Sequence, residues 1–261
     1  KMLDDHNIEW EEKHHSEERI LAADEIIKSP GIPKEAPMIQ KAMAKGINII
    51  SEIEFAGRYT DAKMVCITGS NGKTTTTSLI YHIFKKAGID AGLAGNIGNS
   101  LALQVAEQPH KVYIIELSSF QLDNMYSFKA DIAILLNITP DHLDRYDFCM
   151  QHYVDAKFRI IQNMTADDAF IYWNDDPIIR RELPKYDIKA RQLPFAENME
   201  EGCEGAIVDG MYKLLAPTLF ELKREELSLA GKHNIYNQLA AGLAANVYGI
   251  SHDAIAAGLE D

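Results

Sequence analysis

The stretch from Val65 to Thr77 constrains the fold of this chain most strongly. It reads VCITGSNGKTTTT, so β-prone residues run into a glycine turn, and a lysine and several hydroxyls then open a helix. Glycines in such a turn let backbone N–H groups point inward around an anion, and the helix start adds further N–H groups and the positive end of its dipole. The lysine would supply a cation for the outer phosphates, and the next threonine a hydroxyl for Mg²⁺. The stretch predicts the phosphate cradle of an ATP site, formed by Gly69, Ser70, Asn71, Gly72, Lys73, Thr74 and Thr75.

This cradle departs from the usual G-x-x-x-x-G-K-[ST] pattern. The first glycine of that pattern would fall at Ile67, whereas the chain has G-x-x-G-K-T, with Gly69 two residues late. An ordinary strand–helix turn with a lysine in its first turn is the alternative. The order of strand, turn, GKT and amphipathic helix favours the phosphate site, because this context is what confirms such a motif.

Apolar runs alternate with helical patterns along most of the chain. Strands are predicted at 64–68, 91–94, 112–117, 132–138 and 170–173, and polar residues and a helical pattern follow them. This alternation predicts an α/β fold with a mostly parallel central sheet flanked by helices, as in a P-loop-type ATPase domain. Short strands indicate a small β-rich region near 186–229. We expect a partial Rossmann-like N-terminal domain at 1–58 and a central ATP-binding domain at 59–261.

Composition limits the classes of function. The 261 residues are 46% hydrophobic and carry a formal net charge of −13, so a large core can form, but broad attraction to nucleic acid or anionic lipid is not expected. The three cysteines are widely spaced and odd in number, which favours a reducing compartment over a disulfide framework. No apolar run is long enough to span a membrane, and no signal peptide is visible. We expect a cytoplasmic monomer that binds neither nucleic acid nor membrane.

Polar residues also follow other predicted strands, where ligands bind in parallel sheets. Glu116 lies in an otherwise apolar strand. A buried carboxylate is costly unless it is paired or binds a metal, so Glu116 is either a Mg²⁺ ligand or part of a salt bridge. Asn96, between two glycines, could contact a ligand or simply belong to a turn. Ser118 and Gln121 are suited to hydrogen-bonding a polar substrate.

Four further residues have more than one interpretation. His142 lies just beyond a strand in a cluster of charge, so a second metal site and a structural histidine both stay open. Lys157 lies on a predicted helix, where a salt bridge or a phosphate contact is the simpler expectation. Asn234 and Asn237 are three residues apart near the start of the last long helix and share one side of it. Capping explains one of them, and both together could also reach a base or a ribose.

Taken in order, these motifs resemble the bacterial Mur ligases, and especially the members that add D-glutamate. The resemblance covers roughly residues 26–261. The glycine-loop motif is common to Mur ligases and folylpolyglutamate synthetases, whereas the string that begins at Glu116 is more specific to the D-glutamate-adding members. The strings that carry the resemblance are SPGI (29–32), TGSNGKT (68–74), GNIG (95–98), ELSSFQL (116–122), NITPDHLDRY (137–146) and GKHNIYN (231–237).

The resemblance implies an ATP- and Mg²⁺-dependent ligase of peptidoglycan precursor synthesis, which joins D-glutamate to UDP-N-acetylmuramoyl-L-alanine through an acyl phosphate. It implies that Lys73 contacts the transferred phosphate, that Thr74 and Glu116 hold Mg²⁺, and that His142 helps to hold a second ion. Lys157 falls on the family's carbamylated lysine, which replaces the simpler expectation, because a carbamate is an oxygen ligand for a hard cation. The implied UDP-substrate residues are Ser29, Gly31, Asn96, Ser118, Gln121 and His142, and Asn234 and Asn237 would lie by the adenine.

The chain departs from the family in extent. Nothing in it matches the glycine-rich start of the family's uridine-binding domain, and we find no match to the C-terminal domain that binds D-glutamate. We therefore expect a fragment with negligible ligase activity of its own.

Two other functions stay open. One is a ligase with a different acceptor, as in other Mur ligases or folylpolyglutamate synthetases, since the acceptor is chosen in the C-terminal domain. The string from Glu116 to Leu122 argues against it. The other is a nucleotide-binding module that does not ligate. The shortened cradle, His142 and Lys157 argue against this second function.

Overall fold

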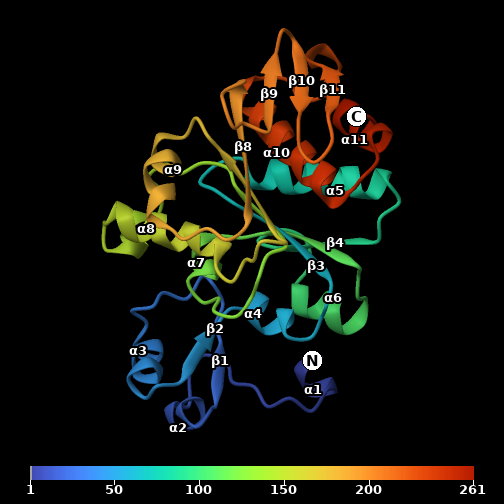
Figure 1. Ribbon diagram of the computed structural model, residues 1–261. Helices are drawn as coiled ribbons and strands as arrows, with labels where there is room; N and C mark the ends of the chain where they lie inside the picture. The colour runs from blue at the N-terminus through green and yellow to red at the C-terminus, as the bar shows by residue number, and fades with distance from the viewer. Residues whose placement is uncertain (1) are drawn as a thin grey trace.

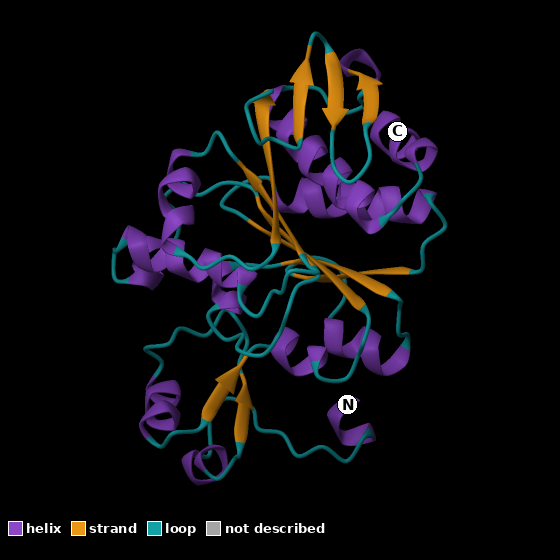
Figure 2. Cartoon of the chain, viewed as in Figure 1, coloured by secondary structure: helices purple, strands orange, loops and turns teal. Residues whose placement is uncertain are grey.

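The computed structural model describes residues 2–261, whose strands form a large sheet and a small one (Figure 1; Figure 2). The strands are β1 (Glu25–Ile27), β2 (Asn48–Ile50), β3 (Lys63–Thr68), β4 (Ala91–Gly95), β5 (Val112–Glu116), β6 (Ile132–Leu135), β7 (Ala169–Trp173), β8 (Arg191–Asn198), β9 (Gly205–Val208), β10 (Met211–Leu214) and β11 (Phe220–Lys223). Within the described residues the central sheet has nine strands in the order β11-β10-β9-β8-β7-β6-β3-β5-β4, and the small sheet pairs β1 with β2 in parallel. The pairs from β4 across to β9 are parallel, whereas β10 is antiparallel to both of its neighbours.

Helices cover both faces of the central sheet (Figure 1). The α-helices are α1 (Met2–Asp5), α2 (Glu17–Leu21), α3 (Pro37–Ala44), α4 (Glu52–Gly57), α5 (Lys73–Lys86), α6 (Leu101–Glu107), α7 (Ser119–Leu122), α8 (Met150–Phe158), α9 (Pro177–Glu182), α10 (Lys232–Tyr248) and α11 (His252–Glu260). The 3-10 helices are η1 (Leu143–Tyr146), η2 (Arg159–Ile161), η3 (Leu183–Lys185) and η4 (Arg224–Glu226). Helices α5, α10 and α11 contribute to the core on one face of the sheet, and α4, α6, α7 and α8 to the core on the other.

Strand β3 shows why the sequence produces this layered structure. Its residues Val65 and Ile67 belong to the core on the α5 face, and Met64 and Cys66 belong to the core on the opposite face. Successive side chains on a strand point to opposite faces, so a strand buried on both sides is a continuous apolar run. The predicted mostly parallel sheet is therefore confirmed.

The order of the strands brings together the three segments that follow β3, β5 and β6, which hold most of the predicted site residues. Strand β3 lies between β5 and β6, and the chain crosses from one side of β3 to the other between these two strands. Ile67 of β3 is in register with Glu116 of β5, and Thr68 of β3 is in register with Leu135 of β6. In parallel sheets, ligands bind where the strand order changes direction in this way, just outside the carboxyl ends of the strands.

The structure adds detail to the sequence-based prediction in the β-rich region near 186–229 and at helix α4. The β-rich region near 186–229 is present as β8 to β11, and these strands extend the central sheet. Helix α4 was not predicted; its Ile53 and Ala56 are buried in the core beneath the central sheet. The division between residues 58 and 59 stays a prediction, although α4, which precedes it, packs against α6. Among the described residues, no helix has both the length and the apolar character needed to cross a membrane.

Candidate active site

The cradle joins β3 to α5 through a turn that only glycine fits well. Gly72, immediately before α5, has a φ of 84°, in the left-handed region. A Cβ at this position would lie 2.4 Å from Oδ1 of Asn237 on α10. A side chain here would therefore strain the backbone and collide with α10.

The segment after β6 supports the cradle. The backbone N–H of Ser70 donates to the carbonyl of Asn137 at 2.9 Å, and the N–H of Asn71 donates to Oδ1 of Asn137 at 2.8 Å. The amide of Asn137 in turn donates to the Asn71 carbonyl at 2.9 Å, and Oγ of Ser70 accepts from the Thr139 N–H at 2.9 Å. The prediction of a strand through 138 was too long, because these residues pair with the cradle after β6 ends. Asn137 had no predicted role, although it is the first polar residue after an apolar run.

Glu116 contacts two other predicted site residues, Thr74 and Asn96, and the three are here called the Glu116 cluster. Glu116 is 1% exposed at the end of β5. Its Oε2 accepts from Oγ1 of Thr74 at 2.8 Å, and its Oε1 accepts from Nδ2 of Asn96 at 2.8 Å. Both partners are neutral, so these contacts satisfy the carboxylate without cancelling its charge. A buried carboxylate beside a hydroxyl offers the hard oxygen ligands that Mg²⁺ prefers.

Two lysines converge on one backbone carbonyl. Nζ of Lys73 and Nζ of Lys157 each donate to the carbonyl of Gly69 at 2.8 Å, and Lys73 also donates to the carbonyl of Ser70 at 3.0 Å. Lys157 is 2% exposed, and its Nζ lies 4.6 Å from the ring centroid of Tyr153. Burial, with the nearby charge of Lys73, lowers the pKa of Lys157 to about 7. Burial also lowers the pKa of Lys73.

Ser118 and Gln121 pair with each other where α7 begins. Oγ of Ser118 accepts from the Gln121 N–H at 3.3 Å, and Oε1 of Gln121 accepts from the Ser118 N–H at 2.9 Å. This reciprocal capping box satisfies two N–H groups at the helix start and fixes both side chains. A substrate contact would come in addition to this cap.

His142 lies at an exposed position beyond the carboxyl end of β6. Its side chain is 60% exposed, and Nε2 lies 3.6 Å from Oδ2 of Asp141. The ring meets the edge of the Phe120 ring, with the centroids 5.5 Å apart. The imidazole is thus accessible to a ligand.

The two asparagines of α10 differ in their surroundings. Oδ1 of the buried Asn237 accepts from Oγ1 of Thr76 at 3.2 Å, whereas the half-buried Asn234 donates to the Ala230 carbonyl at 2.8 Å. A cavity of about 70 Å³ lies beside Asn237, between the cradle and α10. Two aromatic residues with no predicted role, Trp173 and Tyr236, also line this cavity, and their ring centroids are 4.6 Å apart. In the sequence, the features that could have indicated them are the position of Trp173 at the end of a predicted strand and of Tyr236 between the two asparagines.

Ser29 and Gly31 lie in the loop that follows β1 of the small sheet. Nζ of the buried Lys28 donates to the carbonyl of Ile32 at 2.8 Å, and the Arg145 guanidinium of η1 lies 3.4 Å from the same oxygen. A cavity of about 620 Å³ separates the small sheet from α7 and η1. Among residues 2–261, no hydrogen bond joins Ser29 or Gly31 to the cradle, so the structure does not place these two residues with the Glu116 cluster.

Comparison with known proteins identifies the family. The family model described as the Mur ligase middle domain matches residues 67–245, and the one described as the Mur ligase MurD-like N-terminal domain matches residues 2–51. The chain belongs to the Mur ligase family. Its predicted resemblance to Mur ligases is therefore confirmed.

Similar proteins include Mur ligases from several bacteria. The UDP-N-acetylmuramoylalanine--D-glutamate ligase of Bacteroides thetaiotaomicron is 65% identical over 260 residues, and that of Porphyromonas gingivalis is 55% identical over 262 residues. These alignments cover 100% and 99% of this chain, but 59% and 58% of those proteins. A solved Mur ligase structure, UDP-N-acetylmuramate:L-alanyl-gamma-D-glutamyl-meso-diaminopimelate ligase from Neisseria meningitides, matches with a TM-score of 0.65 and 18% identity. It covers 91% of this chain and 78% of that chain, and at this identity it shows the fold alone.

Proposed function

We propose that this chain is the ATP-binding core of a cytoplasmic ligase that adds D-glutamate to UDP-N-acetylmuramoyl-L-alanine. The observation that carries the proposal is the cluster in which Thr74 and Asn96 share the two oxygens of Glu116 beside the cradle. The acceptor is inferred from the name of relatives up to 65% identical, of which this chain spans about three fifths. In this proposal 59–261 binds ATP, and 1–58 contributes to binding the UDP-substrate.

The proposed reaction has two steps. The substrate carboxylate attacks the γ-phosphate of ATP, the bond to ADP breaks, and an acyl phosphate forms. The amine of D-glutamate then attacks the acyl carbon, and phosphate and a proton leave. Phosphoryl transfer needs positioning and charge neutralisation more than covalent chemistry by the protein. The cradle N–H groups and the start of α5 would hold the phosphates, and Lys73 would turn from two carbonyls toward their oxygens.

Thr74 and Glu116 fit a Mg²⁺ ion that accompanies ATP. Their hydroxyl and carboxylate are hard oxygen donors that already lie 2.8 Å apart. The ion, when bound, supplies positive charge next to the phosphate oxygens. The amide of Asn96 holds the other carboxylate oxygen and so keeps Glu116 oriented toward the cradle.

Lys157 and His142 are proposed for a second ion, with Lys157 as a carbamate. Carbon dioxide reacts with a neutral amine, forming an N–C bond and releasing a proton. A lysine whose pKa is about 7 is partly neutral at cellular pH, which supports this assignment. The carbamate would present oxygens where the amine now contacts Gly69.

Phosphate release tests the proposal. The protein, at the full length of its relatives, would be incubated with ATP, Mg²⁺ and UDP-N-acetylmuramoyl-L-alanine plus D-glutamate or L-lysine, or with folate and L-glutamate. Stimulation by D-glutamate together with the UDP-substrate, and by no other pair, supports the proposal. Stimulation by another pair would assign a different acceptor. Phosphate release that no acceptor stimulates would identify a nucleotide-binding module that does not ligate.

A further inference from the structure

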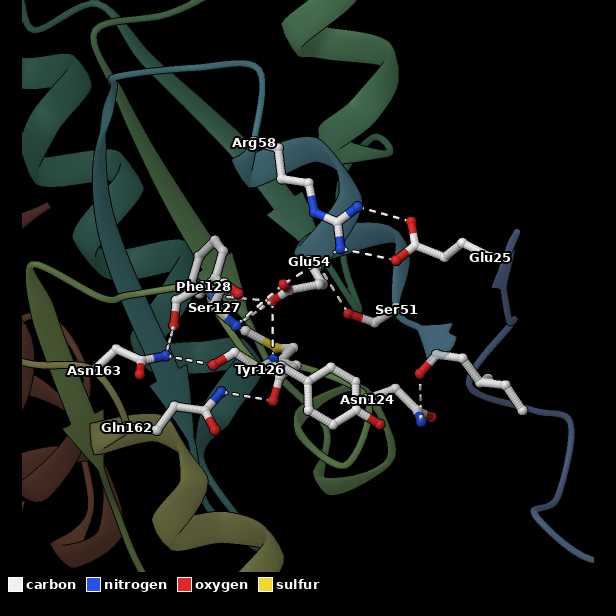
Figure 3. A network of polar contacts seen from close by, with 12 residues as sticks. Glu25, Ser51, Glu54, Arg58, Asn124, Tyr126, Ser127, Phe128, Gln162 and Asn163 are labelled. Carbon is white, nitrogen blue, oxygen red and sulfur yellow. Dashed lines mark hydrogen bonds and ion pairs between the residues drawn. The ribbon is translucent and has the colours of Figure 1, made fainter. Parts of the chain in front are cut away.

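Glu54 is a buried carboxylate that has no part in the proposed chemistry. It lies on α4 and is 1% exposed. Its oxygens accept from three consecutive backbone N–H groups, those of Tyr126 at 3.0 Å, Ser127 at 3.1 Å and Phe128 at 2.9 Å (Figure 3). Hydrogen bonds to an ionised acceptor are stronger than neutral ones. Glu54 thus fixes α4 to residues 123–131, here called the α7–β6 loop.

The carbonyl groups of the α7–β6 loop are held by another segment. Nε2 of Gln162 donates to the Met125 carbonyl at 2.8 Å, and Nδ2 of Asn163 donates to the Tyr126 carbonyl at 2.7 Å (Figure 3). Backbone groups satisfied by two different segments leave the loop little freedom. Helix α7 immediately precedes the loop and is fixed with it, together with two predicted substrate residues, Ser118 at its N-cap and Gln121 within it.

Helix α4 and the α7–β6 loop also hold the small sheet. The guanidinium of Arg58, the C-cap residue of α4, donates to both oxygens of Glu25, in β1, at 2.7 and 3.0 Å, and it lies 3.7 Å from Oε1 of Glu54. Nδ2 of Asn124, in the loop, donates to the carbonyl of Ile49 in β2 at 3.3 Å (Figure 3). Strand β1 therefore connects to Arg58, which lies beside Glu54, and β2 connects to the loop whose N–H groups Glu54 holds.

We propose that Glu54 is a positioning residue, which sets the place of the small sheet relative to the cradle. This inference rests on the proposed function, in which the UDP-substrate contacts both the loop after β1 and the carboxyl ends of the central strands. A ligand that contacts two units binds well only when the separation of the units lets it engage both at once. ATP would contact the cradle side alone, so its binding should not depend on Glu54.

Glu54→Gln tests this role. A glutamine keeps the size of the side chain, but its NH₂ group cannot accept, so one end of it would face backbone donors. In the protein at the full length of its relatives, we expect the KM for UDP-N-acetylmuramoyl-L-alanine to rise about tenfold, with kcat and the KM for ATP within about twofold of wild type. Calorimetric Kd values for the two ligands should show the same split without requiring turnover. Hydrogen exchange at 126–128 should accelerate.

Glu182→Gln is the matched control. Glu182, on α9, is also a fully buried carboxylate, but the side chains that contact it, Gln151 at 3.0 Å, Arg181 at 2.8 Å and Lys185 at 2.6 Å, all lie within the central unit. The control should leave the KM and Kd for the UDP-substrate unchanged. Equal effects of the two variants, or equal changes in the affinities for both ligands, would overturn the inference.

The ion pair between Arg58 and Glu25 gives a second test, which does not require a substitution at the buried Glu54. Arg58→Gln and Glu25→Gln should each raise the same KM by a smaller factor, and the double variant should add little, since both remove one link. Unchanged constants in both single variants would overturn the proposal. A wild type that binds the UDP-substrate without ligating it would refute the proposed function alone, because the Kd values would still test Glu54. A wild type that does not bind this substrate would refute both.

Discussion

Replacing Lys157 with Met should change how stability depends on pH. The pKa of Lys157 is about 7 in the folded chain, against 10.5 for an ordinary lysine. Below pH 7 the amine is charged in both folded and unfolded states, so the folded state bears the whole cost of burying that charge. Between pH 7 and 10.5 the unfolded chain alone keeps the proton, and the stability of the wild type rises with pH. The full gap corresponds to about 5 kcal/mol.

Urea unfolding of both proteins at several pH values, in buffer free of carbon dioxide, measures this effect. From pH 7 to pH 9 the unfolding free energy of the wild type should rise by about 2 kcal/mol relative to Lys157→Met, because methionine has no proton to lose. Lys111→Met, at an exposed lysine, is the control and should give a constant difference. A constant difference for Lys157→Met as well would show that burial and Lys73 do not lower its pKa, and the argument for a reactive amine would fail.

Three other substitutions test the cradle and its supports. Gly72→Ala should lower the unfolding free energy by about 3 kcal/mol, because the new Cβ both strains the left-handed backbone and collides with Asn237. Gly88 also has a positive φ, of 72°, but open space around it, so Gly88→Ala should cost only about 1 kcal/mol. Equal losses for the two variants in urea unfolding would refute the collision. Glu116→Gln should weaken Mg²⁺-dependent ATP binding about tenfold or more in calorimetry; an equal loss in the presence of a chelator would exclude the metal role. Asp176→Ala should cost about 2–4 kcal/mol in urea unfolding, because the buried carboxylate caps α9 and also accepts from the Ile138 N–H at 3.0 Å behind the cradle; a loss below about 1 kcal/mol would contradict this double role.

Much of the central sheet could be predicted because its strands are buried on both faces. The segment 64–67 is continuously apolar, and Thr68, a glycine and a helical pattern follow it, so local sequence determines its structure. The strand order could not be predicted in the same way. Nothing local to 91–95 shows that β4 lies beyond β5 at the edge of the sheet, since that depends on which faces the helices cover.

The Glu116 cluster was predictable in kind, because carboxyl ends of parallel strands share one edge of the sheet. The role of Glu54 was not. Ser51 and Glu54 have the spacing of a capping box, and Ser51 does accept from the Glu54 N–H at 3.1 Å. The Glu54 carboxylate, however, turns to N–H groups more than 70 residues away in sequence. Periodicity and spacing report neighbours along a helix, and they carry no information about a partner from a distant loop.

The shared carbonyl of Gly69 links the cradle to the proposed carbamate chemistry. Two ammonium groups that donate to one oxygen repel each other, and the more buried group, Lys157, is the one whose pKa falls to about 7. Loss of the Lys157 proton would remove its repulsion of Lys73, the residue proposed to contact a phosphate. The reactivity proposed for Lys157 and the phosphate contact proposed for Lys73 would therefore have one structural cause, the packing of α8 directly against the cradle.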